Sequence, residues 1–318
     1  MSLFWEGDAM SMRTSAVKKY INAYVRNELR DNLPFLGKSF SISYSTVGEH
    51  DSKQKAVSAL QTPGDFGCRY NIISNVIEYK LDDKEVVILN AFHFFVTVIK
   101  NEYLPLILGG KYKFILRDSV IERVFFDLET EMGNTYYAKK VWGYHLMAES
   151  ADDYRVFLDD VPCQLVEDEM QIGDSIRKMM LIADRKQKEL ASKYATPDAV
   201  CWLAGSTYAE QFGSKDGGRT IVSLQEFIET NKMMEAQNHH SMRICDITIS
   251  GNQATARLEM LEPTRLGFKH FDALSVYQPY YNEEWTVDLK KENGWKITQM
   301  QYSPISKFQR ITYDTLEV

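Results

Sequence analysis

The sequence predicts an α+β protein made of two similar domains, in which helices pack on one face of a curved, mainly antiparallel sheet. The chain has 318 residues, which is more than a single hydrophobic core usually supports. The same order of helices and strands occurs twice along the chain, and each half ends in four strand-like segments. Helices followed by a run of antiparallel strands are typical of the α+β class.

The first half begins with a predicted helix. Apolar residues at helical spacing place it from Ser15 to about Asn32, and a strand-like segment follows over Ser39–Ser45. A polar turn and a short helix-like stretch then lead to Pro63-Gly64. Four predicted strands rich in Val, Ile, Phe and Tyr come next: Arg69–Leu81, Glu85–Ile99, Leu106–Arg117 and Ile121–Glu129.

The second half repeats this order. A helix is predicted from Ser175 to about Tyr194, and Pro197 suits the first turn of a second short helix ending at Leu203. A strand over Thr207–Phe212 and a helix over Ile221–Met234 follow. The four predicted strands of this half are His239–Ile249, Gln253–Leu261, Tyr281–Leu289 and Gly294–Tyr302.

The predicted domains are residues 1–132 and 175–318, joined by an acidic, aromatic connector over 133–174. Several aromatic side chains in a free tether would form an exposed apolar patch. We therefore expect the connector to pack on a domain surface, through Trp142 and Phe157 among others.

Composition excludes several classes of partner. Lys and Arg number 37 against 44 Asp and Glu, so a net charge of −7 offers no basic surface for nucleic acid. The longest apolar run, Val86–Ile99, is too short for a bilayer, and the first residues lack the order of a signal peptide. Four separated cysteines form no CxxC pair, and nucleotide-binding motifs are absent. We expect a cytoplasmic protein without nucleic-acid or membrane partners.

Several segments of the second half carry a family resemblance. They are the turn FGSKDGG, the stretch NHHSMRICDITISGNQATARLEM and the final NEEWTVDLKKENGWKI. Over Asp184–Pro304 the chain resembles the nuclear-transport-factor-two-like superfamily, which includes SnoaL-like polyketide cyclases, ketosteroid isomerase and scytalone dehydratase. In this resemblance His240 and Gly251 hold the family's His and turn positions, and Trp285 ends its strand. The first half matches more weakly, with Asn71 at the place of the His.

The resemblance implies two cone-shaped domains and a small apolar ligand inside the second. It also implies that the two halves form a pseudo-dimer within one chain, and a homodimer of the whole chain stays open. The ligand-binding candidates share the predicted inner face or flank it: Trp202, Met242, Leu258, Met260 and Trp285.

His240 is the first acid–base candidate, because the pKa of an ordinary imidazole lies near neutral pH. In the resembling enzymes a Tyr donates to the developing oxyanion, a part that Tyr208 or Tyr281 can take. Asp246, inside an apolar strand, is a candidate buried base, and a solvated side chain is its alternative. The alternative for His240 is a structural bond to a backbone carbonyl.

His239 falls on the opposite strand face from His240 and is expected to be solvated or to lie at an inter-domain surface. Neighbouring histidines on opposite faces do not share one metal, and no third ligand is suitably spaced, so no metal site or cofactor is predicted. The expected function is ligand binding, with cofactor-free dehydration, isomerisation or cyclisation by a lyase or isomerase. A noncatalytic ligand-binding or interaction scaffold is the alternative.

Overall fold

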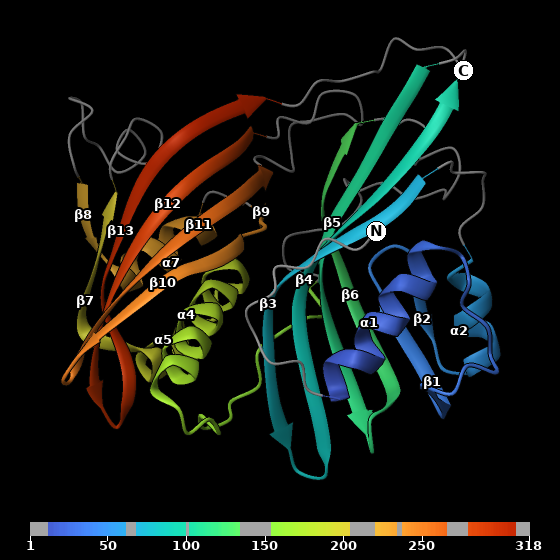
Figure 1. Ribbon diagram of the computed structural model, residues 1–318, viewed down its shortest axis with the longest axis horizontal. Coiled ribbons are helices and arrows are strands. Elements are labelled where there is room, and N and C mark those ends of the chain that lie inside the picture. Colours follow the sequence, from blue (N-terminus) through green and yellow to red (C-terminus); the bar gives the residue numbers. More distant parts are fainter. Residues whose placement is uncertain are drawn as a thin grey trace. The chain divides into compact units, whose positions relative to one another are not determined.

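The computed structural model describes residues 12–61, 68–99, 102–133, 154–203, 220–233, 237–265 and 279–309. It divides into two compact units, one holding the described residues up to Phe157 and the other those from Leu158 onward (Figure 1). Each unit has its own sheet with helices, so the predicted two-domain α+β fold is confirmed. In the ranges given above, no helix has the length and apolar content to cross a bilayer.

The first domain holds a six-stranded sheet in the order β2-β1-β6-β5-β4-β3. Neighbouring strands are antiparallel except for β1 and β6, which are parallel. Its described elements are α1 (Met12–Val25), β1 (Leu36–Tyr44), β2 (Gly48–His50), α2 (Lys53–Ala59), β3 (Cys68–Leu81), β4 (Lys84–Ile99), β5 (Glu102–Arg117) and β6 (Val120–Gly133).

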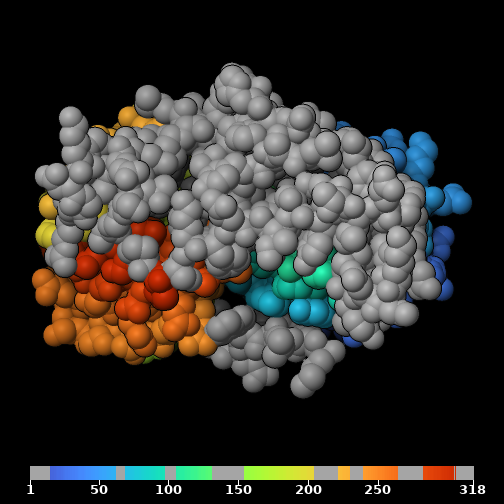
Figure 2. Space-filling model, turned by 90° about the horizontal axis from the view of Figure 1, so that it is seen from above, coloured from blue at the N-terminus to red at the C-terminus, as the bar shows by residue number. Residues whose placement is uncertain are grey.

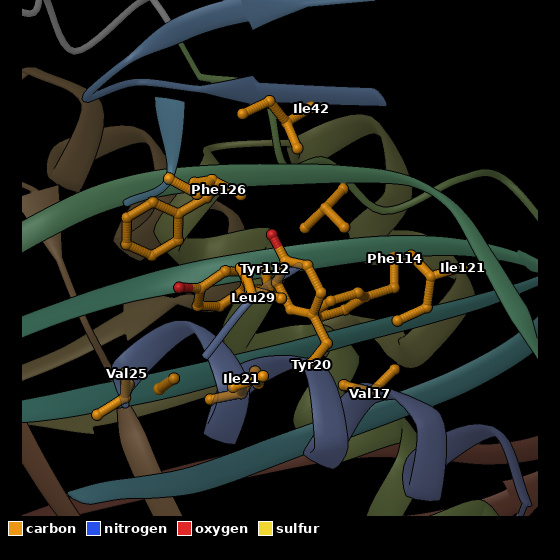
Figure 3. Packing of buried hydrophobic residues seen from close by; sticks show 14 of the residues in the cluster. Val17, Tyr20, Ile21, Val25, Leu29, Ile42, Tyr112, Phe114, Ile121 and Phe126 are labelled. Carbon is orange, nitrogen blue, oxygen red and sulfur yellow. The ribbon is translucent and has the colours of Figure 1, made fainter. Parts of the chain in front are cut away.

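Helix α1 supplies one wall of the first core. Val17, Tyr20 and Ile21 share one side of the helix and are fully buried against the sheet (Figure 3). The Tyr20 ring meets Phe114 edge to face with centroids 5.4 Å apart, and its hydroxyl lies 2.7 Å from that of Tyr44. Each buried side chain of this size stabilises the fold by about 1.5–3 kcal/mol, so this packing fixes α1 on the inner face of the sheet.

The second domain repeats the first. Its sheet runs β10-β11-β12-β13-β7-β8, β7 is parallel to β13, and β9 pairs with β11. Atoms of β10 to β13, orange to red, lie at the surface in Figure 2. The elements are α4 (Asp168–Arg185), α5 (Lys188–Tyr194), β7 (Ala195–Leu203), β8 (Thr220–Ser223), α7 (Leu224–Met233), β9 (Gln237–Asn238), β10 (Ser241–Ser250), β11 (Gln253–Arg265), β12 (Pro279–Glu292) and β13 (Gly294–Gln309).

Helix α4 begins seven residues earlier than predicted, inside the expected connector. Glu167 is its N-cap, and Asp168 and Glu169 lie in its first turn, where carboxylates are favoured by the helix dipole. Asp168 accepts bonds from Lys291 Nζ at 2.6 Å and Trp295 Nε1 at 3.0 Å. The acidic run that suggested a linker therefore marks a helix start tied to the β12–β13 hairpin.

The short helix predicted at Pro197 is wrong, because residues 195–203 form strand β7. The register of β7 against β13 shifts between the pairs Ala195–Ile297 and Val200–Gln299. Pro197 lies in this interruption, where its missing N–H removes no ladder bond. The helix predicted from Ile221 starts instead at Leu224, and Ser223 Oγ caps it by accepting from the Glu226 N–H at 3.0 Å.

The described part of the connector, residues 154–166, has no helix or strand. Asp127 on β6 holds its start, since the carboxylate accepts the backbone N–H groups of Arg155 at 2.9 Å and Val156 at 2.8 Å. Val156 is fully buried, whereas Phe157 is 37% exposed. Trp142 lies outside the described residues. Backbone bonds to Asp127 thus dock this stretch, and Lys113 Nζ adds a bond to the Phe157 carbonyl at 3.1 Å, although the Phe157 side chain stays partly exposed.

Replacing Asp127 with Ala is expected to release this stretch. Two buried or half-buried N–H groups lose a charged acceptor, so the free energy of unfolding should fall by about 1.5–3 kcal/mol. Limited proteolysis should cleave residues 154–158 faster than in the parent chain. Asp160→Ala is the control, because its ion pair with Lys193 is exposed and worth at most about 1 kcal/mol. Equal cleavage of both variants would contradict the role of Asp127.

Candidate functional site

A group of four ionisable side chains is buried inside the second domain: Asp184, His240, Glu262 and Glu283. Each has a side chain or residue exposure of 2% or less. We call this group the acidic cluster. Its members come from α4, the segment before β10, β11 and β12.

His240 is the centre of the acidic cluster. Its Nδ1 contacts Asp184 Oδ1 in a short hydrogen bond, and its Nε2 lies 3.3 Å from Glu262 Oε1. Both ring nitrogens therefore face carboxyl oxygens, an arrangement that suits an imidazolium, whose two N–H groups both donate.

Asp184 lies at the C-terminal end of α4, one residue before the helix ends. Lys186 follows in a left-handed conformation with φ of 57°. Its N–H donates to the Ala183 carbonyl, and the Gln187 N–H donates to the Ile182 carbonyl. A carboxylate at this end of a helix is disfavoured by the helix dipole and gains from a nearby cation. His240 is that cation.

Glu262 and Glu283 continue the inner face of the sheet by strand alternation. Glu262 lies two residues beyond buried Met260 on β11, and Glu283 lies two residues before buried Trp285 on β12. The Trp285 indole Nε1 donates to Glu283 Oε2 at 2.7 Å. Alternation thus brings both carboxyl groups to the same end of the apolar interior.

The pKa values of the acidic cluster follow from burial and mutual charge. Burial lowers the pKa of His240, but the negative charges of Asp184 and Glu262 outweigh it and raise the pKa to about 10. Burial, and then the neighbouring Glu262, raise the pKa of Glu283 well above its usual value. Burial and Glu283 also raise the pKa of the Cys201 thiol. At neutral pH His240 therefore carries a proton on each ring nitrogen.

The sequence-based ligand candidates are mostly inner-face residues. Met242, Leu258, Met260 and Trp285 are buried. Trp202 is half-buried and alternates with the buried Cys201 and Leu203, so its side chain lies on the other face of β7.

The other catalytic candidates do not join the acidic cluster. Tyr208 lies outside the described residues. The backbone of Tyr281 pairs with Glu262 on β11, but its side chain is outside the description. Asp246 is exposed, because a register shift between Ile244 and Asp246 inserts a bulge in β10 and reverses the alternation of faces.

The expectation that His239 is solvated is wrong. Its side chain is fully buried, and its backbone N–H donates to Pro263 O at 3.2 Å. His239 and His240 precede β10, so the strand alternation used to separate them does not extend to this segment.

Sequence reasoning missed Asp184, Glu262 and Glu283. The alternation of Ala256, Leu258 and Met260 extends to Glu262 and was the available signal for it. Asp184 carries no such signal, since its contact with His240 spans 56 residues of sequence.

Among the described residues, no group of three or more His, Cys, Asp or Glu side chains could hold a metal ion. Both His240 nitrogens already face carboxyl oxygens at hydrogen-bonding or ion-pair distance. The side chains present are suited to moving protons.

The first domain has a neutral pair at the corresponding place. Asn71 lies on β3 just before a register shift, as His240 lies just before the shift in β10. Asn71 Nδ2 donates to Asn22 Oδ1 at 2.8 Å, and Asn22 belongs to α1, the helix that precedes this sheet as α4 precedes the other. An amide pair thus stands where the second domain has Asp184 and His240.

The neighbouring strand differs as well. His93 on β4 pairs with Asn71 on β3, and the His93 Nε2 lies 2.7 Å from the Tyr112 hydroxyl oxygen. By the same register, the second domain has Glu262 at this position. Gly110 stands where the second domain has Glu283, and a Cβ there would lie 2.4 Å from Asp127 O and from the Phe126 ring. The first domain therefore has no room for a side chain at the position that Glu283 takes in the second domain.

The SnoaL-like domain family matches residues 164–301. No curated protein matches the chain. A protein from Kribbella flavida is 14% identical, with 44% of this chain and 93% of that chain covered at a TM-score of 0.36. A nuclear-transport-factor-two-like protein of unknown function from Silicibacter pomeroyi is 12% identical, with 43% and 93% covered at 0.29. A type 2 hexachlorocyclohexane dehydrochlorinase is 11% identical, with 38% and 91% covered at 0.28.

Stability should fall as the pH rises from about 6.5 toward about 10. In this window the folded protein keeps a proton on His240 that the unfolded chain releases, because the folded pKa is about 10 against a usual 6.5. The free energy of unfolding should therefore drop by up to about 1.4 kcal/mol per pH unit for this proton. His240→Gln should flatten the curve measured by urea unfolding.

Met242→Leu is the control for that measurement, since it alters a buried neighbour without a titrating group. It should shift the whole curve and keep its slope. A His240→Gln curve parallel to the parent would refute the assignment of the raised pKa to His240.

The neutral pair of the first domain predicts a rescue experiment. Asn22→Asp alone places a carboxylate beside the Asn71 amide and should destabilise the chain by about 1–3 kcal/mol. Adding Asn71→His should recover part of this loss, because the two residues then match the pair in the second domain. A double-mutant cycle in urea at about pH 6 measures the coupling. Additive effects of the two substitutions would show that the sites are not equivalent.

Proposed function

Because residues 164–301 form a SnoaL-like domain, we propose that the second domain binds a small, largely apolar molecule and catalyses proton transfer on it without a cofactor. One observation supports this most strongly: a buried imidazole held between the carboxyl groups of Asp184 and Glu262. Groups with strongly perturbed pKa values in an apolar interior are typical of acid–base sites.

The surroundings favour an apolar ligand. Leu258 and Met260 lie on the same inner face as Glu262, and Trp285 lies beside Glu283. A ligand bound among these side chains would be shielded from water and would present its few polar atoms to the acidic cluster. Apolar pockets with a small number of polar groups usually orient ligands in this way.

The acidic cluster contains both a proton donor and a proton acceptor. Asp184 orients the His240 ring through Nδ1, which leaves Nε2 as the nitrogen that exchanges a proton. A substrate oxygen that takes the place of Glu262 beside Nε2 would accept this proton. A carboxylate of the acidic cluster would accept the second proton, from a carbon atom of the substrate. Dehydration, isomerisation and cyclisation each need such a pair of proton transfers. The proposed enzyme class is accordingly a lyase or isomerase.

A noncatalytic role for the chain is the second candidate. The Asn22–Asn71 pair of the first domain cannot exchange protons near neutral pH, so one of the two domains already lacks this chemistry. If the acidic cluster only stabilises the second domain, the chain is a ligand-binding or interaction scaffold. The two candidates differ in what happens when a ligand is present.

The experiment is a thermal-shift screen of small apolar ketones, hydroxy-aromatics and enones, followed by a turnover assay on each hit. His240→Gln and Asp184→Asn should lower turnover by about 10²–10⁴, because removing a positioned acid or base costs this much. Asp246→Asn is the matched control, since Asp246 is an exposed carboxylate on the adjacent strand β10.

Three results separate the candidates. A rate loss confined to the cluster variants supports catalysis. Binding without turnover in the parent chain favours the scaffold. Equal turnover in His240→Gln and Asp246→Asn would remove His240 from the reaction.

A further inference from the structure

The two glutamates of the acidic cluster lie next to each other on one face of the sheet. Glu283 on β12 pairs with Met260 on β11, two residues before Glu262, and both glutamates are buried with exposures of 1% and 0%. Two carboxylates cannot hydrogen-bond each other, because neither has a donor. A proton on one of them would supply that donor, and neighbouring buried carboxyl groups seldom ionise together.

The surroundings indicate which glutamate carries that proton. Glu262 Oε1 lies 3.3 Å from His240 Nε2, and a cation at this distance favours a negative charge on Glu262. The Glu283 carboxyl accepts only from the neutral Trp285 indole at Oε2, and no hydrogen-bond donor of the described residues faces its Oε1. Two buried carboxyl groups in contact seldom ionise together, so the proton belongs on Glu283.

We propose that Glu283 is a neutral carboxylic acid that donates its hydrogen bond to Glu262, so that the two glutamates form a second acid–base pair beside Asp184 and His240. The use of this pair rests on the proposed function. Its existence rests on the burial and strand positions of the two glutamates and on the Oε1 of Glu283, which no donor of the described residues faces. Glu283 is a positioning residue in this scheme: it holds Glu262 as the anion that faces His240 Nε2.

The groups around Glu283 come from four elements. They are Glu262 on β11, His240 before β10, Trp285 on β12 itself and Cys201 on β7. Of these only His240 is cationic, and Glu262 lies between it and Glu283. The pair therefore supplies a stored proton two steps from the imidazole. When His240 Nε2 gives its proton to a substrate oxygen, the anionic Glu262 takes the proton of Glu283 and passes it to Nε2, which leaves Glu283 as the carboxylate.

This arrangement narrows the ligand class. A site that rests with protons on His240 and Glu283 is ready to donate, so it suits a ligand whose hydroxyl or carbonyl oxygen must be protonated. Among the reactions proposed above, dehydration of a hydroxyl compound fits this protonation state best.

The test is infrared spectroscopy of the full chain without ligand. A buried, protonated carboxyl group gives a carbonyl stretch that ionised carboxylates lack. We expect this band in the parent protein at about pH 7–8, where exposed carboxyl groups are ionised. Its absence would overturn the proposal, whether or not any variant folds.

Two glutamine variants assign the band. Glu283→Gln should remove it, and the new amide can still accept from Trp285 and donate to Glu262. Glu284→Gln should keep it, because Glu284 is half-buried on the opposite face of β12. A band lost in Glu262→Gln and retained in Glu283→Gln would place the proton on the wrong residue and overturn the assignment.

A second readout follows the His240 ring by NMR as the pH rises. Removing a neutral acid should leave this titration nearly unchanged in Glu283→Gln, whereas removing a carboxylate would lower it by about 1–3 pH units. A fall of that size would show that Glu283 is ionised. Neither readout uses a ligand, so a failed turnover assay leaves this inference intact, and a missing band leaves the Asp184–His240 pair to be tested separately.

Discussion

The second domain depends on the neutralisation of charge removed from water. A buried carboxylate or imidazolium is stable only when paired and hydrogen-bonded, and losing one partner of such a pair typically costs about 3–5 kcal/mol. Asp184, at the unfavourable end of a helix dipole, needs the cation His240, and His240 in turn needs the anion that Glu262 provides. The positions of α4, β10 and β11 are therefore linked by electrostatics as well as by packing.

The two domains answer the same packing problem in different ways. The second keeps charges and balances them. The first replaces them with the amides Asn22 and Asn71 and lines its interior with phenols, among them Tyr20 and Tyr44, whose pKa values burial raises. Amides and phenols pay a smaller desolvation cost than ions do. The same topology thus holds a charged cluster in the second domain and an amide pair at the equivalent place in the first, whose buried ion pair, Lys111–Glu129, lies elsewhere in its sheet.

Much of this fold is readable from the sequence, because strand alternation and the internal repeat are local patterns. Leu258 and Met260 show the inner face of β11, and the burial of both agrees with the predicted parity. The alternation predicted the wrong face for Asp246, because one extra residue in a bulge moves every side chain beyond it to the opposite face. It failed at His239 because the segment before a strand follows no alternation.

The site itself was harder to predict. Asp184 is one polar residue among several at the end of a helix, and only the folded chain brings it to His240. The strand alternation that predicts buried Leu258 and Met260 also places Glu262 on the inner face. Glutamate is so often exposed in proteins, however, that its residue type argues against burial. Local sequence patterns do not show which distant residues come together in the folded chain.

Helix α4 is held near both ends, so its number of residues fixes the distance and the rotation between Asp168 and Asp184. Its first turn is held at Asp168 by Lys291 and Trp295, and its last turn places Asp184 on His240. One residue inserted between these points would rotate Asp184 by about 100° and advance it by about 1.5 Å while Asp168 stayed in place. Homologous chains that keep the acidic cluster should therefore conserve the number of residues in this helix more strictly than their identity.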